Sequence, residues 1–236
     1  MTLGRHLSWV MFGIVLNTNV HADGATIAQQ GNGSAAACQS CHGVVGEGIA
    51  AAGFPRLAGM GAGYLQRQLE AFAEGTRSNA VMMPIAKALS AADRKAVASH
   101  YASMPFGGTA AMPLPSSALT SASQGASAPK VSAMATAASA PTPTVGATLA
   151  TRGRWSDTLP ACEQCHGPGG RGVGADFPPL VGQSATYLAA QLTAFKSKAR
   201  PAGPMNLMGV VAQKLSDADV REVAAYYAML PAGGTR

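Results

Sequence analysis

The pentapeptide pattern Cys-x-x-Cys-His occurs twice in this chain of 236 residues, at residues 38–42 and 162–166. The two copies contain all four cysteines of the chain. This pattern is the attachment signature of c-type haem, in which each sulfur bonds to one vinyl group and the histidine ligates the iron. The sequence therefore predicts two covalently bound haem c groups, each with one iron. The expected haem-bonding residues are Cys38, Cys41, Cys162 and Cys165, and the expected iron-ligating histidines are His42 and His166.

Other uses of paired cysteines fit this chain less well. A thiol–disulfide redox motif requires a βαβ context, which the sequence lacks. A zinc site would place two Cys-x-x-Cys pairs about 15–20 residues apart, whereas the first cysteines of these pairs are 124 residues apart. A disulfide framework would not place a histidine after each pair. Residues 167–172 match Gly-x-Gly-x-x-Gly, but they follow a haem motif rather than a strand, so they do not predict dinucleotide binding.

The duplication extends well beyond the haem motifs. Each copy continues with Phe-Pro-x-Leu-x-Gly, at residues 54–59 and 177–182, and then with Tyr-Leu-x-x-Gln-Leu-x-x-Phe, at residues 64–72 and 187–195. Each copy later has Leu-Ser-x-x-Asp and a tyrosine near its end. The chain therefore contains two tandem domains of the same kind.

Both domains are predicted to be helical. Leu65, Leu69 and Phe72 recur at the spacing of one helix face, and the second copy repeats this pattern. Ser90 with Asp93 is typical of a helix start, because the serine hydroxyl can accept from a free backbone N–H. No alternating strand pattern is present, so the expected fold class is all-α. Only 6% of residues are aromatic, so we expect each haem to be the largest apolar body in its core.

The N-terminal residues resemble a secretory signal peptide. Arg5 and His6 precede an apolar run at residues 7–16, and a small-residue cleavage site ends at Ala22. An uncleaved anchor is the alternative, although the run is shorter than the roughly 20 residues that span a bilayer. Export agrees with the haem motifs, since c-type haem is attached outside the cytoplasm. We therefore expect a periplasmic bacterial protein whose mature chain has no membrane span.

The expected division of the chain is a signal peptide at residues 1–22, a first haem domain at 23–106, a linker at 107–149 and a second haem domain at 150–236. The linker is almost wholly Ala, Ser, Thr, Pro and Gly, and it lacks apolar periodicity. Such a composition predicts a long flexible coil. It also predicts domains that are tethered rather than rigidly fused, because few large apolar side chains offset the entropy of ordering the linker. Docking between the tethered domains, transient or firm, stays open.

The charge of the chain does not indicate nucleic-acid binding. The formal net charge is +6, and the propionates of two haems would bring the mature protein close to neutral. No cluster of Lys or Arg supports a nucleic-acid partner.

The second axial ligand decides between electron transfer and catalysis, because an open sixth position permits ligand binding whereas Met ligation suits electron transfer. Met82 lies seven residues before Leu89, and Met208 lies seven residues before Leu215. The repeat register therefore favours Met82 and Met208 as iron ligands, with Met83 and Met205 as rivals and core packing as the alternative role for any one of them. His100 has no counterpart in the second copy, and we expect a surface residue there.

In order and spacing, these motifs resemble those of class I cytochrome c, and the duplication resembles the dihaem cytochrome c4 family. The resemblance covers most of residues 24–106 and 150–232. It implies two small helical domains, a His/Met pair on each iron, and Pro55 and Pro178 carbonyls that accept hydrogen bonds from His42 and His166. It also implies tight packing between the two domains, which the long linker does not fit. An arginine follows the Phe-bearing helix in each copy, at Arg77 and Arg200. Each could pair with a haem propionate or could lie at a solvated helix end.

The expected function is electron transfer without catalysis. Expected donors are a cytochrome bc complex or a periplasmic dehydrogenase, and an expected acceptor is a terminal oxidase. The alternatives are an electron-transfer subunit of a periplasmic dehydrogenase and a catalytic dihaem enzyme of the peroxidase or thiosulfate-oxidising type. Catalysis would require an exchangeable iron site and an acid/base group above it, and the sequence indicates neither.

Overall fold

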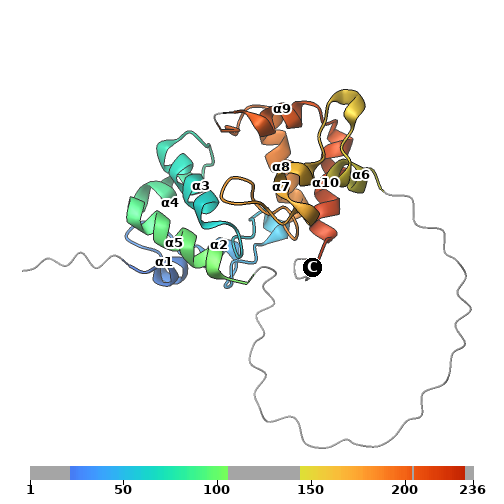
Figure 1. Cartoon of the computed structure of the whole chain (residues 1–236). Helices are drawn as coiled ribbons and strands as arrows, with labels where there is room; N and C mark the ends of the chain where they lie inside the picture. Colours follow the sequence, from blue (N-terminus) through green and yellow to red (C-terminus); the bar gives the residue numbers. More distant parts are fainter. Residues whose placement is uncertain (1–21, 106–143, 204, 232–236) are drawn as a thin grey trace, which may run out of the picture.

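The computed structural model describes residues 22–105, 144–203 and 205–231. The expected signal peptide, apart from Ala22, and most of the expected linker lie outside these residues. Figure 1 shows the described residues as two helical units that lie side by side. Within the described ranges the regular elements are helices, accompanied by isolated β-bridges and no strand. The expected all-α fold of two tandem domains is therefore confirmed.

The helices of the two domains follow each other in the same order. The first domain contains α1 (Gly24–Gln30), α2 (Gln39–His42), η1 (Ala50–Ala52), α3 (Ala62–Glu74), α4 (Met82–Ala88) and α5 (Ala91–Ser103). The second domain contains α6 (Val145–Thr151), η2 (Trp155–Asp157), α7 (Cys162–His166), η3 (Pro168–Gly170), α8 (Ala185–Lys196), α9 (Leu207–Gln213) and α10 (Asp217–Met229). No helix in these ranges is long and apolar enough to cross a membrane.

The first and last helices of each domain cross in close contact. A Cβ atom added at Gly24 of α1 would lie 2.2 Å from the carbonyl oxygen of Ala96 in α5. A Cβ atom added at Gly146 of α6 would lie 2.2 Å from the carbonyl oxygen of Glu222 in α10. A glycine is required at each crossing because any side chain would force the two helices apart.

The last helix of each domain begins with a reciprocal cap. The Ser90 hydroxyl accepts from the Asp93 backbone N–H, and the Asp93 carboxylate accepts from the Ser90 backbone N–H. Ser216 and Asp219 form the same capping box at the start of α10. These caps satisfy N–H groups that have no partner within the helix, so they fix where the helix begins. The expected helix starts are confirmed.

Each core gathers around the last helix. Val97 and Tyr101 of α5 are buried with Leu65, Leu89 and Ile27 from the other elements of the first domain. Burial of each such side chain contributes about 1.5–3 kcal/mol. The second core has the same plan, and its buried members include Leu149, Leu159, Leu215, Val223 and Tyr227.

The second domain begins earlier than the sequence indicated. Thr144 caps α6, and its hydroxyl accepts from the Ala147 backbone N–H at 3.2 Å. Leu149 and Ala150 of this helix are buried in the second core. The linker expected at residues 107–149 therefore ends before Thr144. The helix was missed because its small residues resemble the linker in composition, although Gly146 is there to allow the crossing with α10.

The two domains are in direct contact. Arg67 of α3 donates to the carbonyl oxygen of Ala175 and forms a 2.9 Å ion pair with Asp176 in the second domain. In the repeat register, residues 174–176 correspond to η1, which contacts α8. The contacts are thus related by an approximate two-fold axis. The linker composition had left docking between the domains open, and these contacts show that the two domains dock through complementary polar surfaces.

Candidate haem sites and the interface between them

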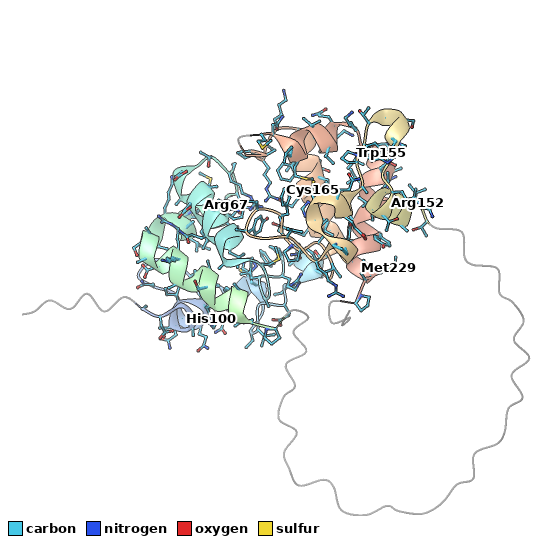
Figure 2. All side chains as sticks on the ribbon, viewed as in Figure 1. Arg67, His100, Arg152, Trp155, Cys165 and Met229 are labelled. Atoms are coloured by element: carbon cyan, nitrogen blue, oxygen red, sulfur yellow. The ribbon has the colours of Figure 1, made fainter. Side chains whose placement is uncertain are left out.

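The haem motifs form one short helix in each domain. In α2 the His42 backbone N–H donates to the Cys38 carbonyl at 2.9 Å, which closes one turn around the two cysteines. In the second domain the same turn is α7, and Cys165 lies exposed on it (Figure 2). The four cysteines form no disulfide, so both sulfurs of each pair are available to bond a haem. The short helix brings both sulfurs and the imidazole of each motif to one end of the domain.

Each motif histidine is oriented by one backbone carbonyl. The Nδ1 atom of His42 lies 2.8 Å from the carbonyl oxygen of Pro55. His166 makes the same 2.8 Å contact with Pro178. Because the carbonyl can only accept, Nδ1 carries the hydrogen and Nε2 is left with a free lone pair. Both imidazoles are buried, and this burial lowers their pKa values, so they are neutral and suited to ligate a metal. The two hydrogen bonds implied by the family resemblance are present.

A glycine-rich loop holds the Pro55 carbonyl in place. The Gly46 carbonyl accepts from the backbone N–H groups of Leu57 and Ala58, at 2.8 and 2.9 Å. Gly46 has a φ of 70°, and a Cβ atom added there would lie 2.7 Å from the Tyr101 ring. Only glycine fits both the backbone conformation and the space. In the second domain the Gly170 carbonyl accepts in the same way from two backbone N–H groups.

A cavity of about 380 Å³ opens in front of the His42 imidazole. Cys38, Cys41 and His42 lie along its wall, and the apolar side chains of Leu65, Leu69, Phe72, Ile85 and Val97 form much of its lining. Its polar lining comes partly from the second domain, through Gln183, Tyr187 and Gln191. A haem has a flat apolar ring and two anionic propionates, so these residues fit it in both respects.

The methionines expected as ligands differ from their rivals in position. Met82 lines the first cavity, whereas Met83 is not among the residues that line it. In the second domain Met208 is half-buried, whereas Met205 is 76% exposed. His100 is partly buried beside Tyr101, outside the cavity lining, and Figure 2 shows it at the lower edge of the first domain.

The interface between the domains has a paired network of polar side chains at its centre. Arg77 donates to Gln68 in its own domain at 2.6 Å and to Gln191 in the other at 2.8 Å. Arg200 donates to Gln191 in its own domain at 2.8 Å and to Gln68 in the other at 3.0 Å. Each arginine also donates to a tyrosine across the interface, Tyr187 or Tyr64.

The positions of these arginines exclude one of the two roles that the sequence left open. Arg77 and Arg200 are both buried, and each guanidinium lies about 4.5 Å above the ring of Phe72 or Phe195 in its own domain. A solvated helix end is therefore wrong for both. Arg77 also lines the first cavity, so propionate pairing stays a prediction that fits its position.

The comparison with known proteins identifies the family. The cytochrome c family model matches residues 22–105 and 146–230. The chain belongs to the cytochrome c family. With two such domains and both Cys-x-x-Cys-His motifs, it is a dihaem cytochrome c that carries two covalent haem c groups and transfers electrons.

Two kinds of relative of this cytochrome stand out. The chain is 46% identical over 209 residues to a thiosulfate dehydrogenase electron acceptor from Stutzerimonas stutzeri (strain A1501), covering 88% of this chain and 86% of that protein. Its fold matches the thiosulfate dehydrogenase TsdBA from Marichromatium purpuratum with a TM-score of 0.70 and 39% identity, covering 89% of this chain and 40% of that one. It also matches reduced cytochrome c4 from Pseudomonas stutzeri with a TM-score of 0.65 and 29% identity, covering 89% of this chain and all of that one.

Sequence reasoning did not find the side chains that join the two domains of this cytochrome. Tyr64 and Gln68 were recognised as repeated positions, but the repeat does not say that they face the other domain. A signal was nevertheless present, since the same Tyr and Gln on the Phe-bearing helix and the same Arg after it recur in both copies.

Proposed function

We propose that this dihaem cytochrome c accepts electrons from a thiosulfate dehydrogenase and passes them to a second redox protein. The observation that carries this proposal is the similarity over nearly the whole chain to thiosulfate dehydrogenase electron acceptors from Stutzerimonas stutzeri and from Thiomonas intermedia (strain K12), at 46% and 43% identity. The match to part of the TsdBA chain supports the same donor. A cytochrome bc complex or another periplasmic dehydrogenase would be a further donor, and a terminal oxidase a suitable acceptor.

We infer that His42 with Met82 and His166 with Met208 ligate the two irons. The Pro55 and Pro178 carbonyls fix each imidazole so that Nε2 is free. Met82 supports the assignment because it lines the first cavity. The haem supplies a one-electron Fe(III)/Fe(II) couple, and Met ligation favours the reduced state.

The interface supports a short path between the two haems. Tyr187, Gln191 and Gln183 of the second domain line the first cavity, so a haem held there would be bounded partly by the second domain. Arg77, at the same end of the cavity, carries the positive charge that a propionate requires. The approximate two-fold axis gives Arg200 the same place toward the second haem. We therefore propose that Arg77 and Arg200 would hold the propionates of the first and second haem at the interface.

We propose that this cytochrome has no catalytic turnover of its own. Among the described residues that line the first cavity there is no Asp or Glu. An acid/base group of that kind is what a peroxidase-like site above an open iron would need. The haem motifs and the N-terminal sequence together support a periplasmic location, since c-type haem is attached outside the cytoplasm.

Rapid-mixing kinetics test the donor. The oxidised holoprotein is mixed with a thiosulfate dehydrogenase that thiosulfate has already reduced, and haem absorbance is followed. We expect fast reduction of both haems, with an observed rate that rises with dehydrogenase concentration. Thiosulfate alone is the control and should reduce the cytochrome far more slowly. Reduction no faster with the dehydrogenase than without it contradicts the proposed donor, and rapid thiosulfate turnover by the cytochrome alone contradicts its role as a carrier.

A further inference from the structure

One part of the interface breaks the approximate two-fold symmetry. The repeat register aligns Arg56 with Pro179, and Met60 with Gln183. The arginine, the glutamine and the tyrosine of the polar network at the centre of the interface are each repeated in the two domains. The pair formed by Arg56 and Gln183 has no such repeat, because proline has no N–H and methionine has no amide.

Gln183 clamps the backbone of Arg56 from the other domain. The Arg56 backbone N–H donates to Gln183 Oε1 at 3.0 Å, and Gln183 Nε2 donates to the Arg56 carbonyl at 3.1 Å. Both residues are buried, with 4% of Arg56 and 2% of Gln183 exposed. A side-chain amide thus pairs with both polar groups of one backbone residue, which fixes that residue in a single position.

The Arg56 guanidinium lies in a cage of backbone carbonyls. It donates to the carbonyl oxygens of Val181 at 2.9 Å and Gly182 at 3.4 Å in the second domain, and to Ala58 in its own. Burial lowers the pKa of Arg56 to about 10, so the group stays protonated near neutral pH. A full positive charge is therefore held between the domains.

This charge is close to the first haem site and has no equivalent at the second. Arg56 follows Pro55, whose carbonyl orients the His42 imidazole, and Arg56 is one of the residues that line the cavity in front of that imidazole. The corresponding Pro179 carries no charge. The first haem site therefore has one buried positive charge that the second lacks at the equivalent position.

We propose that Arg56, positioned by Gln183, raises the reduction potential of the first haem and so sets the two haems of this cytochrome apart. A ferric haem carries one more positive charge than a ferrous haem, so a nearby cation stabilises the reduced state. The effect is larger in a buried site, where the effective dielectric constant is low. The inference rests on the two covalent haems and not on which protein is the electron donor, so it survives if thiosulfate dehydrogenase is not the donor.

Redox titration of the full-length holoprotein tests the proposal. The Arg56→Gln substitution removes the charge, and Arg56→Lys keeps it. We expect Arg56→Gln to shift the midpoint of the first haem downward and to move the second much less, while Arg56→Lys retains most of the original value. In a Met82→His background the first haem lacks the Met–iron absorption band. The absorbance at that band then reports the midpoint of the second haem alone, so the two midpoints can be assigned.

Gln183→Met is the matched control for a purely structural role. It disturbs the same part of the interface but leaves the Arg56 charge in place, so its shift should be clearly smaller than that of Arg56→Gln. Equal shifts from these two variants, equal shifts of both haems, or no shift would overturn the proposal.

A gain-of-charge variant keeps the test decisive if Arg56→Gln yields no holoprotein. The double substitution Met60→Gln/Pro179→Arg builds the missing half of the symmetric arrangement beside the second haem. We expect the midpoint of the second haem to rise, because the new arginine adds a buried positive charge near it. An unchanged or lowered second midpoint would overturn the proposal.

Discussion

Arg200 in the second domain donates a hydrogen bond to the Tyr64 hydroxyl in the first, at 2.9 Å. Burial alone would raise the pKa of Tyr64, but the guanidinium groups of Arg200 and Arg77 outweigh burial and lower it. The pair belongs to a network in which each domain supplies an arginine, a glutamine and a tyrosine. Because part of this network is satisfied only by the other domain, the two domains depend on each other.

The Arg200→Ala substitution should loosen the domain interface. It leaves the Tyr64 hydroxyl without its donor and removes the stacking on Phe195, so we expect a loss of about 1–3 kcal/mol in the free energy of unfolding. Denaturant unfolding of the holoprotein measures it. Arg67→Ala is the control at the same interface, because the Arg67–Asp176 pair is largely exposed and should contribute less than about 1 kcal/mol. Equal losses would mean that the buried network adds nothing to domain packing.

The methionine ligands are testable one haem at a time. Met82→Ala and Met208→Ala should each remove about half of the weak Fe(III)–S absorption band, since each would ligate one of two irons. Met83→Ala and Met205→Ala are the matched controls and should leave the band intact. Loss of the band in a control variant instead would transfer the ligand role to that residue.

Much of the site could be predicted because it is local in sequence. The motif at residues 38–42 places both sulfurs and the imidazole on one helical turn, and the capping pair of Ser90 and Asp93 marks the start of the last helix. The repeat doubles each of these signals. The His42–Pro55 hydrogen bond came from a resemblance rather than from the residues, because a backbone carbonyl has no sequence signature.

The domain interface could not be predicted because it depends on distant pairs. Gln183 and Arg56 are far apart in the sequence, and neither residue alone indicates a partner. The linker composition predicted tethered domains. A flexible linker does not reveal whether the domains that it joins have complementary surfaces. The start of α6 at Val145 was hidden for a similar reason, because its short run of small residues continues the linker composition.

The Tyr101 hydroxyl should be dispensable for folding. It is buried, and in the described part of the chain it has no stronger hydrogen-bond partner than the Cys38 sulfur. A sulfur is a weak hydrogen-bond acceptor, so Tyr101→Phe should change the free energy of unfolding by less than about 1 kcal/mol. Tyr101→Ala is the contrast, with an expected loss of about 3–5 kcal/mol because it empties the core beside α1. A large loss in Tyr101→Phe would show that the hydroxyl has a partner in the holoprotein.

The helix crossing in the first domain should not tolerate a side chain. Gly24→Ala would place its Cβ atom 2.2 Å from the Ala96 carbonyl oxygen, so α1 must move away from α5. We expect a loss of about 1–3 kcal/mol in the free energy of unfolding, as for other overpacked cores. Gln30→Ala, at the exposed end of the same helix, should change it by less than about 0.5 kcal/mol. Thermal unfolding of both variants makes the comparison, and a neutral Gly24→Ala would contradict the close crossing.

The second domain should lose stability in acid through one carboxylate. Arg154 donates to both carboxylate oxygens of Asp219, each at 3.0 Å. The hydrogen bonds from Arg154 lower the pKa of the Asp219 carboxylate to about 2, below its ordinary value of 3.8. Because the pKa is lower in the folded state, the stabilisation is complete above about pH 4 and is lost as the pH falls toward 2.

Asp219→Asn isolates this effect. It should lower the free energy of unfolding by up to about 2 kcal/mol at pH 7, and the difference from the unsubstituted protein should shrink as the pH falls from 4 to 2. Asp157→Asn is the control, since Asp157 contacts the same arginine but is half exposed and should contribute less than about 1 kcal/mol. Denaturant unfolding at pH 7 and pH 2.5 measures both. A difference for Asp219→Asn that stays the same at the two pH values would mean that the carboxylate stabilises α10 through its neutral capping hydrogen bonds rather than through its charge.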